Sequence, residues 1–162
     1  MQFYYSDLVE VIRNSLRESG LAPQFLEIEL TETLLMRNCE ESARSLEKLR
    51  ALGVTVAIDD FGTGYSSLSY LQRLPLDLLK IDRSFLRDIE TGATAAVVNA
   101  ITVLAHSLNL RVVAEGVETI NQMESVRSMG VDIAQGYLFG KPMPADAVLG
   151  WLASESAMVA RA

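Results

Sequence analysis

Short apolar runs alternate along this chain with longer segments in which apolar residues recur at helical spacing. The runs occupy residues 26–30, 54–58, 76–81, 112–114 and 133–138. Runs this short, flanked by helical segments, are typical of strands buried in a parallel sheet. The alternation therefore predicts an α/β fold with about five parallel strands and their helices.

The segments between the runs carry apolar stripes that predict helices. The stripes cover residues 8–16, 43–49, 97–108, 123–129 and 148–152. Gly20, Gly53 and Gly130 follow three of these stripes, as expected for residues that end helices. Thr119 precedes the fourth stripe and is expected to cap its first turn.

The chain is too short for a complete α/β barrel. It has 162 residues, which is the size of one domain. A closed (β/α)8 barrel takes about 250 residues. Five strands therefore form either an open sheet or part of a barrel.

Composition and charge exclude several classes of function. The formal net charge of −7 argues against a DNA-binding surface, because such surfaces are basic. Cys39 is the only cysteine, so the chain has no internal disulfide and no multi-cysteine zinc site. His106 is the only histidine and lies in a predicted helix, so we expect a structural or surface role and no Ser-His-Asp triad.

No apolar run reaches the roughly 18 residues that a membrane-spanning helix needs. The first ten residues also lack the basic and apolar regions of a signal peptide. We therefore expect a cytoplasmic segment without membrane contact of its own. This expectation is compatible with a membrane anchor elsewhere in a longer parent protein.

Polar residues gather where each predicted strand ends. They are Glu29, Glu32, Asp59, Asp60, Lys80, Asp82, Glu115, Glu118 and Gln135. In open α/β sheets and in α/β barrels, ligands bind at the carboxyl ends of the strands. The pattern therefore predicts a functional site at this edge.

The pair Asp59-Asp60 is the most informative of these positions. Two adjacent carboxylates repel each other and need a cation or a proton to coexist. Mg²⁺ and Mn²⁺ favour carboxylate oxygens. A Gly-Thr-Gly loop follows, and Ser66 or Ser67 then offers a helix N-cap. The alternative is a surface turn that is merely acidic and rich in glycine.

The other acids and Lys80 have structural alternatives as well. Glu32 and Glu118 could be first-turn acids of the helices that follow them. Lys80 either meets an anion, such as a phosphate, or extends its charge to solvent. Glu115 is a candidate for a general base or a partner of a metal-bound water.

Five segments in this order resemble the EAL domain family of cyclic di-GMP phosphodiesterases. They are Glu-Leu-Thr-Glu at 29–32, Asp-Asp-Phe-Gly-Thr-Gly-Tyr-Ser-Ser-Leu at 59–68, Leu-Lys-Ile-Asp at 79–82, Ala-Glu-Gly-Val-Glu-Thr at 114–119 and Gln-Gly-Tyr at 135–137. The closing Gly-Lys-Pro at 140–142 is also similar to the end of the family's sequences. The resemblance covers the chain from residue 25 onward.

The resemblance implies a (β/α)8 TIM-barrel fold with two Mg²⁺ or Mn²⁺ ions in a complete site. It implies that Glu29, Asp59 and Asp60 bind metal, with Asp59 bridging both ions. It implies that Lys80 contacts the attacking water or the phosphate, and that Glu115 lies near the second metal or its water. Supporting positions would be Glu32, which holds the Asp-Asp-Phe loop, and Gln135, which lines the site, with Glu118 and Asp82 beside them. The implied reaction is hydrolysis of cyclic di-GMP to linear pGpG in bacterial signalling.

The chain departs from the family in one respect. It contains no Glu-Ala-Leu tripeptide, and a metal-binding Asn segment of the family is also absent. The whole chain, residues 1–162, is therefore expected to be the C-terminal five β/α units of an EAL domain, folded as an incomplete barrel. We expect weak or absent activity on its own, and self-association that covers unpaired strand edges.

Two other functions stay open at this point. A non-catalytic EAL-type domain could sense cyclic di-GMP or dock a protein partner, although the retained acids favour the hydrolase. Another metal-assisted barrel enzyme could use Lys80 as a base.

Overall fold

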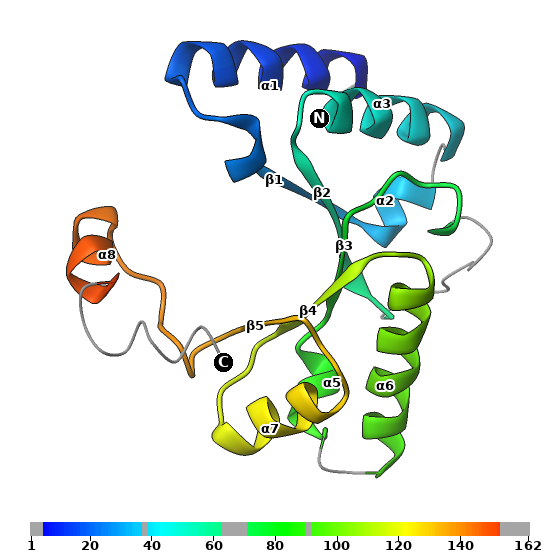
Figure 1. Ribbon diagram of the computed structural model, residues 1–162, viewed down its shortest axis with the longest axis vertical. Helices are drawn as coiled ribbons and strands as arrows, with labels where there is room; N and C mark the ends of the chain where they lie inside the picture. The colour runs from blue at the N-terminus through cyan, green and yellow to red at the C-terminus, as the bar shows by residue number, and fades with distance from the viewer. Residues whose placement is uncertain (1–4, 37–38, 63–70, 90–91, 153–162) are drawn as a thin grey trace. The chain divides into compact units, whose positions relative to one another are not determined.

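The computed structural model describes residues 5–36, 39–62, 71–89 and 92–152. Its sheet contains five strands in the order of the chain (Figure 1). They are β1 (Glu27–Thr31), β2 (Thr55–Phe61), β3 (Leu78–Ile81), β4 (Arg111–Glu115) and β5 (Ile133–Gln135). The predicted α/β fold with five parallel strands is confirmed, and the sheet is not closed within the described residues, as expected of an incomplete barrel.

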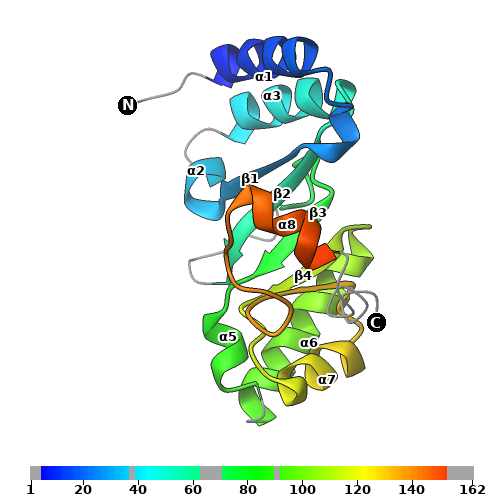
Figure 2. The same ribbon diagram turned by 90° about the vertical axis from the view of Figure 1, so that its left-hand side faces the viewer.

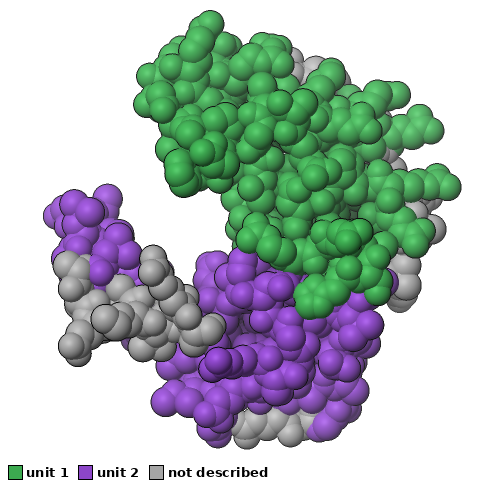
Figure 3. Space-filling view, in the orientation of Figure 1, with its two compact units in different colours: residues 1–80, 105–111 green, residues 81–104, 112–162 purple. Residues whose placement is uncertain are grey.

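The chain divides into two compact units, which Figure 3 colours separately. The first unit comprises residues 1–80 and 105–111. Its helices are α1 (Tyr5–Ser19), α2 (Glu32–Met36) and α3 (Cys39–Ala51), with a 3-10 turn at Pro23–Phe25. Helix α1 lies alongside α3 in both ribbon views (Figures 1 and 2), and the apolar stripes of both helices are buried.

The second unit comprises residues 81–104 and 112–162. Its elements include α5 (Ser84–Arg87), most of α6 (Gly92–Ser107), α7 (Ile120–Ser128) and α8 (Ala145–Leu152). The predicted cap at Thr119 is confirmed, because Thr119 and Gln122 form a reciprocal capping box at the start of α7. The Gln122 side chain also donates a hydrogen bond of 2.9 Å to the Leu86 carbonyl, which ties α7 to α5.

The structure corrects several predicted boundaries. The expected strand at 133–138 is too long, because β5 ends at Gln135 and a turn closed from Phe139 N–H to the Gly136 carbonyl follows. The expected strand at 54–58 is too short, because β2 continues through Phe61. Apolar spacing missed α2 and α5, which are too short to show a stripe. The proposed cap at Ser66 or Ser67 lies outside the described residues.

Two aspartates, one just before β3 and one just before β5, form hydrogen bonds to the backbone of the preceding strand in the same way. Asp77 precedes β3, donates its N–H to the Val56 carbonyl (2.9 Å) and accepts from the Val56 N–H through Oδ2 (3.0 Å). Asp132 precedes β5 and forms the matching pair with Val112, at 3.2 and 2.7 Å. Each carboxylate therefore supplies a hydrogen bond that the sheet ladder lacks at that point.

Replacing Asp77 with alanine is expected to lower the free energy of unfolding by about 1–3 kcal/mol, because the N–H of fully buried Val56 loses its acceptor. Urea denaturation measures the change. Asp77→Asn keeps an acceptor oxygen and should cost less. Asp77 also pairs with Arg50 (2.9 Å) on the surface, so Arg50→Ala should cost less than about 1 kcal/mol. Equal losses for Asp77→Ala and Arg50→Ala would contradict this assignment.

Candidate functional site

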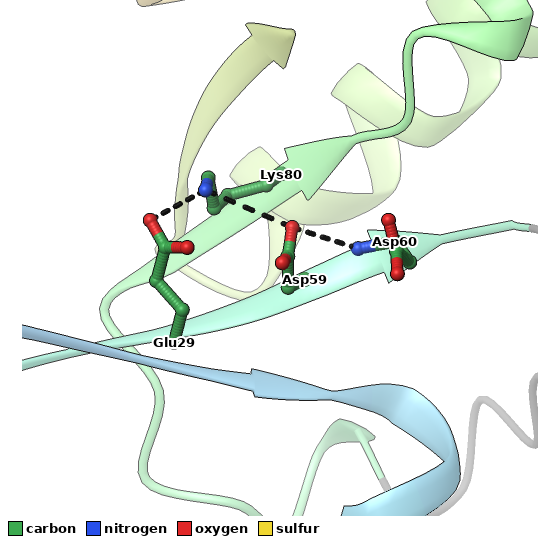
Figure 4. A network of polar contacts seen from close by, with 4 residues as sticks. All are labelled: Glu29, Asp59, Asp60 and Lys80. Carbon is green, nitrogen blue, oxygen red and sulfur yellow. Dashed lines mark hydrogen bonds and ion pairs between the residues drawn. The ribbon is translucent and has the colours of Figure 1, made fainter.

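Lys80 is a buried residue at the centre of a polar network formed by β1, β2 and β3 (Figure 4). Its side chain is almost fully enclosed, with only 3% of the residue exposed. Its Nζ donates to Glu29 Oε1 at 2.5 Å and lies 3.7 Å from Asp59 Oδ1. A buried ammonium needs such partners to offset its lost hydration. Lys80 therefore contacts two carboxylates, and the alternative, that its side chain extends to solvent, is wrong.

The strand register explains why the two carboxylates converge. In the parallel pair of β1 and β2, Glu29 lies opposite Ala57 and Thr31 lies opposite Asp59. Side chains two residues apart on a strand share a face. Glu29 and Asp59 therefore lie on the same face of the sheet, where Lys80 from β3 reaches both.

Asp60 departs from the extended backbone conformation of β2 near the end of that strand. Its φ of 54° lies in the left-handed region, which aspartate tolerates better than most residues but at some cost. Its N–H donates to Asp59 Oδ1 at 2.9 Å. Backbone strain of this kind concentrates at functional sites, where the surrounding structure maintains it. The conformation of Asp60 is compatible with a functional role for the Asp59-Asp60 pair, and the alternative of an acidic turn stays open.

Glu32 begins α2, as the first-turn alternative predicted, but its carboxylate does not behave as a solvent-facing cap. Only 6% of the residue is exposed, and none of the described residues donates a hydrogen bond to its buried Oε2. An unsatisfied buried carboxylate oxygen costs more than about 1–3 kcal/mol. The position in the first turn of α2 therefore does not by itself explain why this carboxylate is buried.

A second group of predicted residues lines one pocket in the second unit. Glu115 lies opposite Gln135 in the parallel pair of β4 and β5. Both line a pocket of about 210 Å³ together with Glu118. Arg83 and Tyr137 line it as well, and the strand-end pattern missed both of them. Arg83 directly follows Asp82 at the end of a strand, which is the signal that could have found it.

Asp82 supports the turn that leads into α5. Burial raises the pKa of its carboxyl. Hydrogen bonds from Ser84 and from the Arg83 backbone, together with the Arg83 charge, lower the pKa by more than burial raises it. The pKa therefore lies below its ordinary value of 3.8. The Ser84 N–H donates to Asp82 Oδ1 at 3.0 Å. Asp82 thus accepts hydrogen bonds within the turn that leads into α5.

The donor chemistry of the first unit suits a hard divalent cation. Glu29, Asp59 and Asp60 offer only carboxylate oxygens, and two of them already converge on one positive charge, the Lys80 ammonium. Within the described ranges, however, no group of three or more His, Cys, Asp or Glu side chains is arranged to hold a metal ion. Likewise, no helix in the described part of the chain is long and apolar enough to cross a membrane.

Comparison with known families agrees with this geometry. A family model described as "EAL domain" matches residues 1–142. The chain belongs to the EAL domain family. Its residues 29–32, 59–62 and 79–82 therefore occupy positions of an EAL domain, and its open five-strand sheet is part of the barrel-type fold of this family.

Three relatives illustrate the similarity. The chain is 51% identical over 140 residues to cyclic di-GMP phosphodiesterase NbdA of Pseudomonas aeruginosa, covering 86% of this chain and 18% of NbdA. A solved cyclic di-GMP complex of the phosphodiesterase PaMucR has a TM-score of 0.83 and 48% identity, covering 87% of this chain and 57% of that one. A manganese and cyclic di-GMP complex of Klebsiella pneumoniae BlrP1 has a TM-score of 0.77 and 39% identity. The match covers 84% of this chain and 35% of that one. The chain spans about a fifth of the length of the curated relatives it matches.

Proposed function

We propose that this chain supplies the catalytic acids of a domain that hydrolyses cyclic di-GMP to linear pGpG. The observation that carries the proposal is the convergence of Glu29 and Asp59 on buried Lys80, beside the strained Asp60. The relatives named as cyclic di-GMP phosphodiesterases support the substrate and the reaction.

Glu29, Asp59 and Asp60 would hold Mg²⁺ or Mn²⁺, two ions in a complete site. When bound, these cations supply the Lewis acidity that activates the attacking water and offsets charge on the phosphodiester. Lys80 keeps Glu29 and Asp59 in position and presents its ammonium to the attacking water or the phosphate. Its burial makes this charge more effective than it would be in water.

Glu115 is the proposed proton acceptor at the site. The oxygen of the attacking water would form a bond to phosphorus while its proton passes to Glu115. The bond from phosphorus to one ribose oxygen of the ring would break, and that oxygen would take up a proton from solvent, which leaves a linear dinucleotide with a terminal phosphate. Gln135 and Glu118 line the pocket beside Glu115. Glu32 is proposed to hold the Asp-Asp-Phe loop, residues 59–61, in place, and its buried carboxylate supports this proposal.

We expect little activity from the 162-residue chain by itself. The family resemblance assigns further metal ligands to a Glu-Ala-Leu segment and an Asn segment, and this sequence contains neither. Loss of ligands weakens metal binding. We also propose a cytoplasmic location, and self-association through the exposed edges of the open sheet.

A second candidate is a domain that senses cyclic di-GMP without cutting it. The retained Glu29, Asp59, Asp60, Lys80 and Glu115 favour the hydrolase, because a sensor has no need of a catalytic acid set.

A fusion protein separates the two candidates. The segment of NbdA that directly precedes its matched region would be joined to residue 1 of this chain. The fusion is expected to convert cyclic di-GMP to pGpG with Mn²⁺, at least about 100-fold faster than the chain alone, because the ligand set is completed. Asp59→Asn in the fusion should abolish turnover. Tight binding without turnover would select the sensor.

A further inference from the structure

A pocket of about 250 Å³ lies at the end of the sheet where the strands begin, away from the Lys80 network. The last turn of α3 and the loops that lead into β3 and β4 form it, all within the first unit. Its walls are mostly apolar, from Leu71, Leu74, Pro75, Leu76, Leu108 and Leu110. The proposed reaction does not use this pocket, because the acids and Lys80 lie toward the other ends of the strands.

Arg50 supplies a fixed positive charge to this pocket. Its Nη2 pairs with Asp77 Oδ1 at 2.9 Å, and Asp77 is itself hydrogen-bonded to the backbone of Val56. A guanidinium held in this way beside apolar walls suits the face of an aromatic ring. An apolar cavity of about 150 Å³ is enough to hold benzene, so this pocket admits the ring of a phenylalanine.

Phe25 presents such a ring at the same end of the sheet. It ends the 3-10 turn directly before β1, and 73% of the residue is exposed. Hydrogen bonds of 3.0 Å from Phe25 N–H to the Ala22 carbonyl and from Leu26 N–H to the Pro23 carbonyl fix the turn. A single exposed apolar residue is normal on a protein surface. Phe25 gains its meaning from the pocket nearby, because an aromatic ring on a rigid turn loses little entropy when it is bound.

The turn and the pocket flank the C-terminal end of α3. A β-carbon at Gly53, just after this helix, would lie 3.3 Å from Pro23 Cβ, so the turn packs there. Arg50, in the last turn of the same helix, lines the pocket, whereas Phe25 lies outside the described lining. Because ring and pocket share one end of one unit, a two-fold axis between them places each ring in the pocket of a second copy. Such an interface is self-complementary and closed.

The charges beside the ring and the pocket are complementary. Glu27, two residues after Phe25, is exposed. Arg50 and Arg73, which is next to the lining residue Gln72, are exposed as well. In the reciprocal contact, an acid beside each ring approaches arginines beside each pocket, which favours this register over others.

We propose that this chain forms a two-fold dimer in which the Phe25 ring of each copy fills the pocket of the other and stacks on Arg50. The inference rests on the self-association proposed above, but not on the reaction or its substrate. It assigns a specific anchor and a specific occupant, a second copy of this chain, to the end of the sheet where the strands begin.

Sedimentation equilibrium of the 162-residue chain over an about 100-fold range of concentration measures the dimer, because its population follows mass action. Phe25→Ala is expected to weaken dimerisation about 30-fold or more, the scale of losing one buried aromatic anchor. Gln72→Trp fills the pocket from an exposed lining position and should weaken it to a similar extent. Val11→Ala removes a side chain on α1 that is 53% exposed and should leave dimerisation unchanged. Circular dichroism shows whether each variant is folded.

A mixture of the two weakened variants tests the reciprocal contact. Phe25→Ala keeps the open pocket and Gln72→Trp keeps the ring, so one of the two contacts can form in a mixed dimer. The mixture should therefore associate more strongly than either variant alone. A dimer that is indifferent to both substitutions, or a mixture no stronger than its parts, would overturn this interface. A chain that stays monomeric at every concentration would contradict the proposed self-association as well, whereas turnover by the fusion tests the reaction separately.

Discussion

Replacing Gly136 with alanine is expected to lower the free energy of unfolding by about 3 kcal/mol or more, the upper range for overpacking a buried contact. A β-carbon there would lie 2.2 Å from the Val117 carbonyl oxygen and 2.3 Å from its nitrogen. These atoms belong to the backbone and cannot rotate away. Two hydrogen bonds of 3.0 Å, from Val117 N–H to Gln135 and from Leu138 N–H to Val117, flank the contact and would be broken with it.

Urea denaturation of Gly136→Ala measures this loss. Gly150→Ala is the matched control, because a β-carbon at Gly150 in α8 meets nothing within 4 Å. That control should be neutral or slightly stabilising, since alanine favours a helix over glycine. A loss below about 1 kcal/mol for Gly136→Ala would show that the loops after β4 and β5 adjust freely.

Replacing Lys80 with methionine is expected to reduce hydrolysis of cyclic di-GMP by the NbdA fusion by about 10³-fold, the scale of losing one group that stabilises developing charge. Mn²⁺ binding is expected to persist or tighten. The reason is that the Lys80 ammonium, bonded to Glu29 at 2.5 Å and 3.7 Å from Asp59, opposes a second cation at the same oxygens. Turnover would thus fall while metal binding is retained or strengthened.

Turnover assays and Mn²⁺ titrations of the fusion test this separation. Lys48→Met removes a positive charge from an exposed position on α3 and should leave both measurements unchanged. Loss of Mn²⁺ binding in Lys80→Met would show that Lys80 acts only by holding the carboxylates in place.

Much of the fold follows from local patterns in the sequence. The apolar runs predicted five parallel strands, and Thr119 predicted the start of α7 because its cap is satisfied by Gln122, three residues away. The end of β5 was not predictable in this way. It depends on the close approach of Gly136 to Val117, a residue distant in the sequence whose position no local pattern reveals.

The candidate site was predictable to a similar extent. Strand ends predicted that Glu29, Asp59 and Lys80 would lie at one edge, and the structure places all three in one network. The left-handed φ of Asp60 and the packing of Arg83 on Gly116 were not predictable. The packing of Arg83 on Gly116 joins two separate segments of the chain, which hydrophobic periodicity does not report.

The central claim is that these acids support metal-dependent cleavage of cyclic di-GMP. Chromatography of the products formed by the fusion tests it most directly, with three arms: added Mn²⁺, a chelator without added metal, and Asp59→Asn with Mn²⁺. The account predicts pGpG in the first arm and unchanged cyclic di-GMP in the other two. Equal amounts of pGpG from Asp59→Asn and the unmodified fusion, or no pGpG in any arm, would contradict it.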